Sequence, residues 1–512
     1  MAILGLDIGT TGTKAVLFRE DGEVIGRAYR EYDLVSPQPG WLELDPRTVI
    51  AAVREVVGRA AVLASEKRDP IRSLGICTLG EAAVPVDAHH EPVANAIVGF
   101  EARGKEELEA FRARLDEERV FAITGHGFNA SHTLFKILWR RRETPDVFAR
   151  TKKFLCFGDF AAASFGLEPR TDHSIAARTL AFDIHRREWS EEILSAAALD
   201  PSLFARPIAP GDVVGELGAN DLGLPTGTIV GGGLHDQPAG ILGSGVRPGE
   251  AMLATGTVIC LGVRLTTSPD PKVMVASNLC EYPTFGANQR ISIAFNFTGG
   301  SLLKWYRDTL GTADLLESTP RGANPYDVIC EGLPDAPTGL LVLPHFSMTG
   351  TPWFDERALG SIHGLRLTTT RKEIVKAILE GLLFEIRLNS ELLRQAGVEI
   401  ERYRAIGGAA RSRTWMQIAA DILDRPVIVL EVDEVAALGA ALMGARAAGI
   451  LDGEGEIQAL VEKTAKVRAI LEPRPEHARR YSELYEIYRD LYPATKEISH
   501  RLFALGERPF GS

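Results

Sequence analysis

The stretch GGGLHDQPAG at Gly231–Gly240 ends an apolar strand at a carboxylate that is flanked by His235 and Gln237. Its glycines leave the backbone bare in front of Asp236 and make room there for a ligand. A carboxylate within hydrogen-bond reach of an alcohol can accept its proton, which makes Asp236 a candidate general base. Asp beside glycine is also typical of a tight turn, and this stretch alone is compatible with both interpretations.

Three glycine-rich turns follow apolar strands and could present backbone N–H groups to phosphate oxygens. They read GTTGTK at Gly9–Lys14, TGT at Thr255–Thr257 and GGAARS at Gly407–Ser412. Lys14 adds a positive charge to the first turn, but none of the three fits the Walker A or the GxGxxG pattern. Each turn alone is more typical of structure than of function. Three turns together, with Asp7 and Asp236 at strand ends, favour a phosphate-binding site.

Alternating apolar segments predict the elements that carry these residues. ILGLDIGTTGTKAVLF at 3–18 predicts a β-hairpin, a third strand follows, and 46–65 has helical spacing. A long helical stretch is expected from Gly104 to about Arg150. TIVGGGLHD and EAMLATGTVICLGV then repeat a strand–turn–strand pattern that loosely resembles the first one. We therefore expect two halves built on one plan, with a boundary near Gly245–Gly249.

Size and composition limit the class of protein. The chain has 512 residues, of which 45% are hydrophobic and 24% charged, so two large domains are expected. A net charge of −11 argues against a nucleic-acid or anionic-membrane partner. The start of the chain lacks a basic segment typical of a signal peptide, and no apolar run is long enough to span a bilayer. The five cysteines show no metal-binding spacing. These features predict a soluble cytoplasmic protein.

DIGTTGTKAVLF followed by PGWLELDP resembles the N-terminal signature of the FGGY carbohydrate kinases, which include glycerol kinase and xylulokinase. Further family-like segments follow in order along most of the chain: RTDHSIAARTLAFDI, GGGLHDQPAG, FTGGSLLKWYRD, GLLVLPHFSMTGTPWFDERALGSIHGL, AILEGLLFEIR and GGAARSRTWMQIAADILDRPV. Any one of them could arise by chance, but six in register identify the chain as a member of this family.

The resemblance implies an α/β fold with two ribonuclease-H-like domains of the actin/hexokinase type and an interdomain cleft. We expect a sugar-binding N-terminal domain at 1–246, an ATP-binding C-terminal domain at 247–450 and a helical tail at 451–512. Aromatic residues recur at helical spacing in that tail between Tyr481 and Tyr492, which is typical of a packing face. The implied reaction is ATP-dependent phosphorylation of a sugar or polyol hydroxyl, with Asp236 as the base and Mg²⁺ bound by Asp7.

The resemblance also places the ATP ligands. Four residues of the first turn are expected to face the β- and γ-phosphates: Thr10, Thr11, Thr13 and Lys14. Gly256 and Thr257 match the phosphate turn of the second domain. The ribose, α-phosphate and adenine are expected near Gly300, Gly408, Ala409 and Ser412.

The sugar side departs from the family pattern. Many relatives carry Trp-x-Asp-x-Arg where this chain has Gly99-Phe100-Glu101-Ala102-Arg103, and an Arg that precedes the acid in glycerol kinase is replaced by Gly80. The expected substrate-binding residues are Glu81, Glu101, Arg103, His235 and Gln237. Acids and an amide suit hydroxyl groups, so a neutral polyol or ketose is expected, although the pattern does not select among sugars.

An alternative is a nucleotide-dependent regulatory or binding protein on the same fold that has lost phosphotransfer. The altered segment at 99–103 motivates it, whereas the presence of Asp7, Lys14 and Asp236 weighs against it. A homodimer is compatible with the family resemblance, but no interface is evident from the sequence.

Overall fold

A computed structural model describes residues 1–101, 103–432 and 434–506. The chain forms two compact units, each discontinuous in sequence. The first unit comprises Met1–Gly245, Cys280–Ile291 and Glu434–Ala465, and the second comprises Val246–Leu279, 292–432 and 466–506. The expected domains at 1–246, 247–450 and 451–512 are contiguous, so they differ from this grouping at Val246, at 280–291 and 434–465, and at 466–506, which belongs to the second unit. The segments 280–291 and 434–465 both return to the first unit.

A six-stranded sheet forms the centre of the first unit, in the order β13-β14-β5-β1-β2-β3. Its strands are β1 (Ala2–Ile8), β2 (Gly12–Arg19), β3 (Val24–Glu31), β5 (Ile71–Thr78), β13 (Val213–Glu216) and β14 (Ile229–His235). The β1–β2 hairpin and the antiparallel β3 confirm the predicted three-strand meander. β1 and β14 both run parallel to β5. The C-terminal ends of these strands, with Asp7 and His235, therefore lie at the same end of the sheet.

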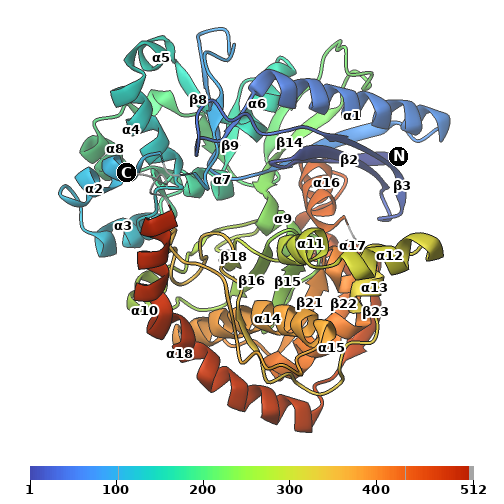
Figure 1. Cartoon of the computed structure of the whole chain (residues 1–512). Helices are drawn as coiled ribbons and strands as arrows, with labels where there is room; N and C mark the ends of the chain where they lie inside the picture. The colour runs from blue at the N-terminus through green and yellow to red at the C-terminus, as the bar shows by residue number, and fades with distance from the viewer. Residues whose placement is uncertain (102, 433, 507–512) are drawn as a thin grey trace. The chain divides into compact units, whose positions relative to one another are not determined.

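Two helices cover opposite faces of this sheet (Figure 1), α1 (Pro46–Glu66) and α16 (Val435–Ala447). Side chains of a strand alternate between faces, so Leu4 and Leu6 reach the core with α1 whereas Gly5 faces α16. A Cβ on Gly5 would lie 1.9 Å from the carbonyl oxygen of Ala437, and one on Gly75 would lie 1.7 Å from that of Ala440. The sheet and α16 therefore meet backbone to backbone.

The predicted helical stretch from Gly104 to about Arg150 is divided into four helices, α2 (Lys105–Arg112), α3 (Glu117–Thr124), α4 (Thr133–Glu143) and α5 (Pro145–Arg150). Asp116 caps α3 by accepting from the backbone N–H of Arg119, and Gly125 ends it in the left-handed conformation, with φ 69°. Pro145 then starts α5, since proline suits a first helical turn.

Shorter elements complete the first unit: β4 (Glu43–Leu44), β6 (Ala83–Val86), β7 (Ala96–Ile97), β8 (Lys153–Cys156), α6 (Phe157–Ser164), β9 (Arg170–Asp172), α7 (His173–Arg178), β10 (Phe182–Asp183), β11 (Glu188–Trp189), α8 (Glu191–Ala197), η1 (Pro201–Leu203), β12 (Arg206–Ile208), α9 (Asp236–Gly243) and α17 (Gly453–Thr464). Among them, α7 and α9 lie directly beside the predicted site residues.

A seven-stranded sheet, in the order β17-β18-β16-β15-β21-β22-β23, follows the same plan as the first. Its strands are β15 (Glu250–Thr255), β16 (Ile259–Leu265), β17 (Tyr282–Pro283), β18 (Arg290–Asn296), β21 (Arg402–Ile406), β22 (Val427–Leu430) and β23 (Val467–Leu471). As in the first unit, an antiparallel hairpin (β15–β16) is joined to a parallel strand (β21) and then to a second one (β22). The loose sequence repeat therefore corresponds to a repeated topology.

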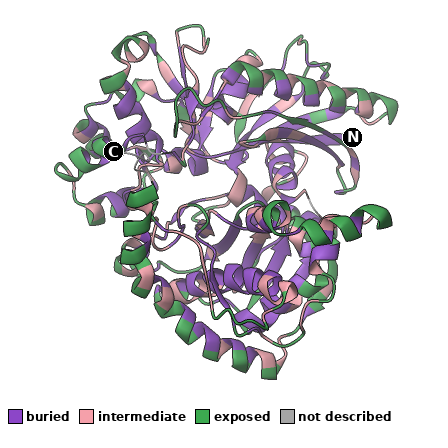
Figure 2. Cartoon of the chain, in the orientation of Figure 1, coloured by how far each residue is buried: buried purple, intermediate pink, exposed green. Residues whose placement is uncertain are grey.

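The helices of the second unit include α14 (Arg371–Gln395), α15 (Arg413–Leu423) and α18 (Pro475–Gly506), with shorter ones at α10 (Pro271–Ala276), α11 (Gly300–Thr309), α12 (Thr312–Arg321) and α13 (Pro325–Cys330). Thr370 and Glu373 form a capping box at the start of α14. The remaining elements are β19 (Leu341–Leu343), β20 (Ser361–His363) and η2 (Gly408–Arg411). Figure 2 shows that the strands and the inner side of α14 are buried, whereas much of α18 is exposed.

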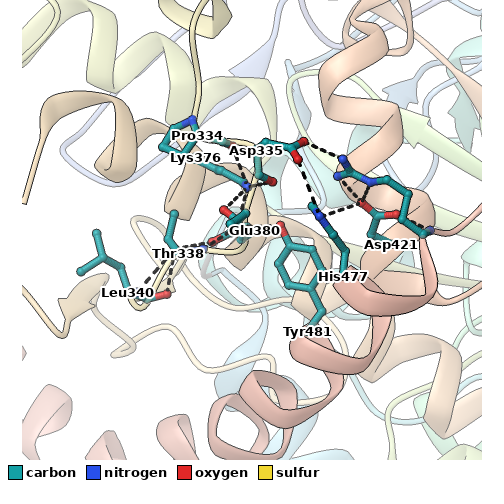
Figure 3. A network of polar contacts seen from close by, with 11 residues as sticks. Pro334, Asp335, Thr338, Leu340, Lys376, Glu380, Asp421, His477 and Tyr481 are labelled. Carbon is teal, nitrogen blue, oxygen red and sulfur yellow. Dashed lines mark hydrogen bonds and ion pairs between the residues drawn. The ribbon is translucent and has the colours of Figure 1, made fainter.

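A buried polar network attaches α18 to this unit (Figure 3). The Tyr481 hydroxyl donates to Glu380 Oε1 at 2.7 Å, and Lys376 Nζ lies 3.7 Å from the same oxygen. Arg474, just before the helix, donates from Nη2 to Asp421 Oδ2 at 2.6 Å. The aromatic residues of α18 are at most 2% exposed at positions 481, 485, 488 and 492, which confirms that they form a packing face.

No helix in the described ranges is both long enough and apolar enough to cross a membrane.

Candidate active site

Asp236 is the first residue of α9 and follows β14 directly. Its side chain is 32% exposed, so a ligand can reach it, yet its Oδ1 atom is covered and has no hydrogen-bond partner among the described residues. Burial raises the pKa of Asp236 to about 7, and the negative charges of Asp7 and Glu81 act in the same direction, while hydrogen bonds from Gln237 lower it. An accessible carboxylate with an unsatisfied oxygen suits proton abstraction.

Asp7 lies near the end of β1, opposite Cys77 of β5 and Lys14 of β2 in the strand register. Burial raises the pKa of Asp7, whereas the positive charge of Lys14 lowers it. Since the Asp7 charge in turn raises the pKa of Asp236, the two carboxylates share one electrostatic environment. The structure thus brings together the two acids that the sequence placed at separate strand ends.

The first glycine turn is fixed by its own hydrogen bonds. The N–H of Gly9 donates to the carbonyl of Gly12 at 2.9 Å, and the Tyr32 hydroxyl donates to the carbonyl of Gly9 at 2.6 Å. Thr13 is fully buried and its hydroxyl donates to the carbonyl of Asp7, so this hydroxyl proton is already used. Of the residues predicted to face phosphate, Thr11 is exposed, and Thr10 is partly exposed.

Lys14 is also engaged within the first unit. Its Nζ lies 2.6 Å from Glu434 Oε2, at the start of α16, and Arg27 Nη1 lies 3.8 Å from the other oxygen of the same carboxylate. A third of the Lys14 side chain remains accessible. Glu434 therefore holds the ammonium group near the turn rather than leaving it free to move.

In the second unit, the three predicted ATP-binding segments come together. The N–H of Gly300, which begins α11, donates to the carbonyl of Gly256 at 2.8 Å. The Thr255 hydroxyl donates to the carbonyl of Ile406 at 2.8 Å, and a Cβ on Gly407 would lie 2.8 Å from the carbonyl oxygen of Thr255. The ends of β15 and β21 are therefore adjacent, with bare backbone between them.

The remaining predictions of this group fall at the start of α15. Gly408 has no atom within 4 Å of where a Cβ would be built, so open space adjoins it. Ala409 follows in the short helix η2. Ser412 caps α15 by accepting from the backbone N–H of Trp415 at 3.3 Å, which gives this hydroxyl a structural partner. A nucleotide contact by Ser412 stays a prediction.

Glu81 occupies the left-handed region of backbone space, with φ 61°. A non-glycine residue in this conformation is strained, and such strain is typical of functional sites. The Thr133 hydroxyl donates to the carbonyl of Glu81 at 2.6 Å and helps to hold this conformation. Arg178 Nε donates to Glu81 Oε1 at 2.6 Å, and Arg178 Nη2 donates to the same oxygen. The second carboxylate oxygen is left to accept from a ligand.

Two glycines surround this carboxylate. A Cβ on Gly80 would lie 3.0 Å from His235 Nε2, and a Cβ on Gly99 would lie 3.2 Å from Glu81 Oε2. The arginine that relatives carry at the position of Gly80 would not fit here without moving His235. Arg178 places a guanidinium beside Glu81 from a different element, α7.

Neutral imidazoles line the space next to Asp236. His235 Nε2 lies 3.1 Å from Asp236 Oδ1, without the alignment of a hydrogen bond, and His235 Nδ1 lies 3.1 Å from the Tyr282 hydroxyl. The Tyr282 ring packs on His126 with centroids 5.4 Å apart, and His126 packs on His132 at 5.2 Å. Burial holds the pKa of His235 and of His126 well below the usual range and that of His132 at about 3.

Glu101 and Arg103 form a buried ion cluster. Arg103 Nε donates to Glu101 Oε2 at 2.6 Å and its Nη1 donates to Glu43 Oε1 at 2.6 Å. Lys136 Nζ donates to the carbonyls of both residues, and the guanidinium lies 4.2 Å from the Trp41 ring centroid. The side chains of Glu101 and Arg103 are only 1% and 4% exposed. Both carboxylate oxygens already have protein partners, so the geometry favours a supporting role. Ala102 lies outside the described residues.

Sequence reasoning missed Arg178, Tyr282, His126 and His132. Arg178 lies within RTDHSIAARTLAFDI, where a cation at the end of an otherwise small and apolar segment was an available signal. Tyr282 belongs to Cys280–Ile291, which returns to the first unit from far along the chain, so no local pattern indicates its position. In the described part of the chain, no group of three or more His, Cys, Asp or Glu side chains is arranged to hold a metal ion.

Comparison with known proteins gives a consistent result. The model for the N-terminal domain of the FGGY family of carbohydrate kinases matches residues 2–243, and the model for its C-terminal domain matches 251–448. A glycerol kinase from Symbiobacterium thermophilum is 32% identical over 473 residues, or 89% of this chain and 91% of that protein. A xylulose kinase from Bacillus subtilis is 25% identical over 504 residues, 98% of each chain. A crystal structure of a xyloylose kinase from Brucella ovis superposes with a TM-score of 0.85 and 29% identity, covering 97% of this chain and 100% of that one.

Proposed function

The chain belongs to the FGGY family of carbohydrate kinases, and we propose that it transfers the γ-phosphoryl group of ATP to a hydroxyl of an uncharged polyol or ketose. The observation that carries this proposal is the Asp236 carboxylate, which is accessible on one side and has a covered, unpartnered oxygen on the other. Its neighbours are the paired Glu81 and neutral imidazoles, which together resemble a site for a hydroxyl-bearing ligand.

The base role of Asp236 follows from its environment. An alcohol is a weak nucleophile, and an ionised carboxylate that accepts its proton makes attack on phosphorus easier. The Asp236 pKa of about 7, raised mainly by burial, gives the carboxylate a higher proton affinity than an exposed Asp while leaving a large ionised fraction near neutral pH. A mutation that removes the charge and keeps the shape therefore tests the role directly.

Unpartnered acceptor atoms on Asp236, Gln237 and His126 support an uncharged, hydroxyl-rich substrate. Three buried acceptor atoms have no hydrogen-bond partner among the described residues: Asp236 Oδ1, Gln237 Oε1 and His126 Nε2. His126 Nδ1 faces the carbonyl of Thr124 at 2.9 Å and must donate to it, so Nε2 is an acceptor. The guanidinium of Arg178 is already paired with Glu81. A substrate carboxylate would therefore be repelled rather than bound.

The glycine turns are proposed to bind ATP. Thr10, Thr11 and Lys14 supply polar groups in the first unit, and Gly256, Thr257, Gly300 and Gly408 supply bare backbone in the second. Asp7 fits Mg²⁺, because it is a partly buried carboxylate at the strand end that precedes the first glycine turn. Mg²⁺ needs only one or two protein carboxylates beside water and phosphate oxygens. When bound, it would neutralise phosphate charge.

The alternative of a regulatory protein without phosphotransfer is not favoured. Relatives that match nearly the whole chain are kinases. In the segment that motivated the alternative, Glu101 and Arg103 form a buried ion cluster. The departure from the family motif at 99–103 therefore leaves the proposed base, Asp236, in place.

The test is ADP release with MgATP against a panel of polyols, ketoses and aldonates, run for the parent protein and for Asp236→Asn. We expect turnover with an uncharged acceptor and a fall in kcat of roughly 10²–10⁴-fold in the variant, the usual contribution of a general base. Asp221→Asn, which changes an exposed carboxylate paired with Arg54, is the matched control and should leave kcat unchanged.

Two results would contradict the proposal. Full turnover by Asp236→Asn would remove the base role, and a preference for aldonates over every uncharged acceptor would remove the proposed substrate class. ATP affinity, measured by equilibrium titration, shows whether a loss of turnover comes from chemistry or from a failure to bind nucleotide.

A further inference from the structure

The six-residue helix α7 touches the base segment at one end and the Glu81 carboxylate at the other. We propose that α7 is a positioning element that fixes Asp236 through Ser174 and Glu81 through Arg178. The distance between the base carboxylate and the acceptor-binding carboxylate is then held constant. This inference rests on the proposed roles of Asp236 and Glu81 and adds Ser174 and Arg178 as positioning residues.

The Ser174 end is a closed hydrogen-bond chain. Asp172 caps α7, and its Oδ1 accepts from the Ser174 hydroxyl at 2.5 Å and from the Ser174 N–H at 2.8 Å. Because the hydroxyl proton is directed to Asp172, a lone pair of Ser174 Oγ is left to accept from the backbone N–H of His235 at 2.8 Å. Ser174 is fully buried, and Asp172 and His235 are 7% and 8% exposed, so water does not compete for these bonds.

This contact fixes the backbone immediately before the base. The ladder between β14 and β5 is irregular between Gly231 and Leu234 and resumes at the pairs Leu234–Cys77 and His235–Thr78. The end of β14 is therefore held by β5 on one side and by Ser174 on the other. Since His235 precedes Asp236 and is the N-cap of α9, a shift of its N–H group would move the base carboxylate directly.

The Arg178 end holds the acceptor-binding carboxylate. Both Arg178 contacts go to Glu81 Oε1, which leaves Oε2 facing the space beside Gly99. The main chain of Arg178 is itself fixed, because its carbonyl accepts from His132 Nδ1 at 3.0 Å. The side chains of Arg178 and Glu81 are 12% and 14% exposed, so this ion pair is well shielded from solvent. Such a pair orients a carboxylate more strictly than a surface pair would.

Helix geometry connects the two ends. Ser174 and Arg178 are four residues apart, which places them on one face of the helix about 6 Å apart along its axis. Asp172 and His132 anchor the two ends separately. A helical turn with both ends fixed behaves as a spacer, and the distance it sets is the one a substrate must span between Glu81 and the base.

The two ends predict different kinetic defects. Ser174→Ala removes the acceptor for the His235 N–H, so the base segment loses its orientation. We expect kcat to fall at least tenfold while the KM for the acceptor changes less than twofold. Ser174→Thr keeps the hydroxyl and should recover most of kcat. Ser164→Ala, which removes a partly buried hydroxyl bonded to Ala161 in α6, is the matched control.

Arg178→Lys should show the opposite pattern, because Glu81 Oε1 loses its two-donor guanidinium partner, whereas the segment before Asp236 keeps its contact with Ser174. We expect the KM for the acceptor to rise at least tenfold, with the KM for ATP unchanged and kcat changed less than threefold. The double variant Glu81→Gln/Arg178→Met removes the whole ion pair without leaving an unpaired charge. It should also raise the KM for the acceptor, and it remains testable if Arg178→Lys impairs folding. Arg141→Lys, whose guanidinium bonds to carbonyls at 197–198, is the matched control.

The split between kcat and KM separates positioning from general destabilisation. If Ser174→Ala and Arg178→Lys both lower kcat and raise KM in proportion to a lower Tm, α7 is only structural and the inference is wrong. It is also wrong if both variants match the parent enzyme. Retained turnover in Asp236→Asn would overturn the proposed function instead, so the two failures are distinguishable.

Discussion

At the scale of single residues, the activity of this kinase should follow the ionisation of Asp236. As the proposed base, Asp236 must be deprotonated, so kcat/KM should rise with pH through the Asp236 pKa of about 7 and level off above it. Glu81→Gln removes a negative charge that raises this pKa, so the ionised form becomes more favourable and the rising limb should move to lower pH. A pH profile of kcat/KM for both proteins measures the shift.

A move of the rising limb of the kcat/KM pH profile to lower pH is not expected from a general loss of substrate affinity. Glu188→Gln changes an exposed carboxylate paired with Arg186 and should leave the pH profile of kcat/KM unchanged. A limb that stays fixed in Glu81→Gln, or moves to higher pH, would mean that Glu81 does not act on the base electrostatically. KM for the acceptor should rise in the same variant, since Glu81 Oε2 is lost as an acceptor.

Residues of the site divide into those that local pattern predicts and those that it does not. Asp7, Asp236 and Glu81 follow apolar strands, and strand ends at one edge of a parallel sheet converge, so their grouping follows from the sequence. Arg178 lies on α7 and Tyr282 arrives from a distant segment. Their positions depend on tertiary packing, which periodicity does not encode. The inward turn of Glu101 and Arg103 likewise depends on Trp41 and Lys136 from other segments.

At the scale of elements, the contact between the first sheet and α16 should tolerate no added atom. Gly75→Ala would place a Cβ 1.7 Å from the carbonyl oxygen of Ala440, and a backbone atom cannot rotate away. Overpacking in a core costs about 1–3 kcal/mol, occasionally more, and we expect the upper end here. The Tm of the variant should fall, and thermal unfolding followed by circular dichroism measures it.

Gly58→Ala is the matched opposite case. Gly58 lies inside α1, and the nearest atom to an added Cβ is the carbonyl oxygen of Leu222 at 3.9 Å. Alanine in a helix interior is favoured over glycine by roughly 0.5–1 kcal/mol, so this variant should raise the Tm. If both substitutions shifted the Tm in the same direction, the close approach of α16 would not be what limits position 75.

Elements were predictable where periodicity is strong. The hairpin at the start of the chain, α1 and α14 follow alternating or helical spacing together with capping signals such as Thr370 with Glu373. The region from 104 to 150 reads as one helical stretch because its apolar spacing is helical throughout. The helices are separated by single residues: Asp116 and Gly125 cap the two ends of α3, and Pro145 starts α5. A single capping residue changes the apolar spacing little, so the breaks are not evident from periodicity.

At the scale of the whole molecule, the described chain passes between the two units five times: at 245/246, 279/280 and 291/292, between 432 and 434, and at 465/466. The first unit is therefore incomplete without segments encoded far downstream. We expect a fragment of residues 1–245 to lack a cooperative thermal transition and to bind a hydrophobic dye, because the sheet face that α16 covers is then exposed. Calorimetry and dye fluorescence measure both properties.

Adding residues 434–465 to that fragment through a short flexible linker should improve its folding. The two ends are close, since a Cβ on Gly243 would lie 2.0 Å from the carbonyl oxygen of Val435. A cooperative transition in the unextended fragment would show that α16 is dispensable for the first unit. The linear domain division expected from sequence misses this dependence, because chain order is visible in a sequence and the return of a segment is not.

The meeting of α16 with the first sheet also bears on recombination among related kinases. Gly5, Gly75 and Gly231 of the sheet face main-chain atoms of Ala437, Ala440 and Met443 in α16, and Gly444 of the helix faces the backbone of Gly75. This contact between the sheet and α16 depends on the absence of side chains at the glycines and not on pairs of complementary side chains. A hybrid that takes residues 1–245 from one parent and residues 434–465 from another should therefore accept the foreign α16, provided that each parent keeps glycine at these positions.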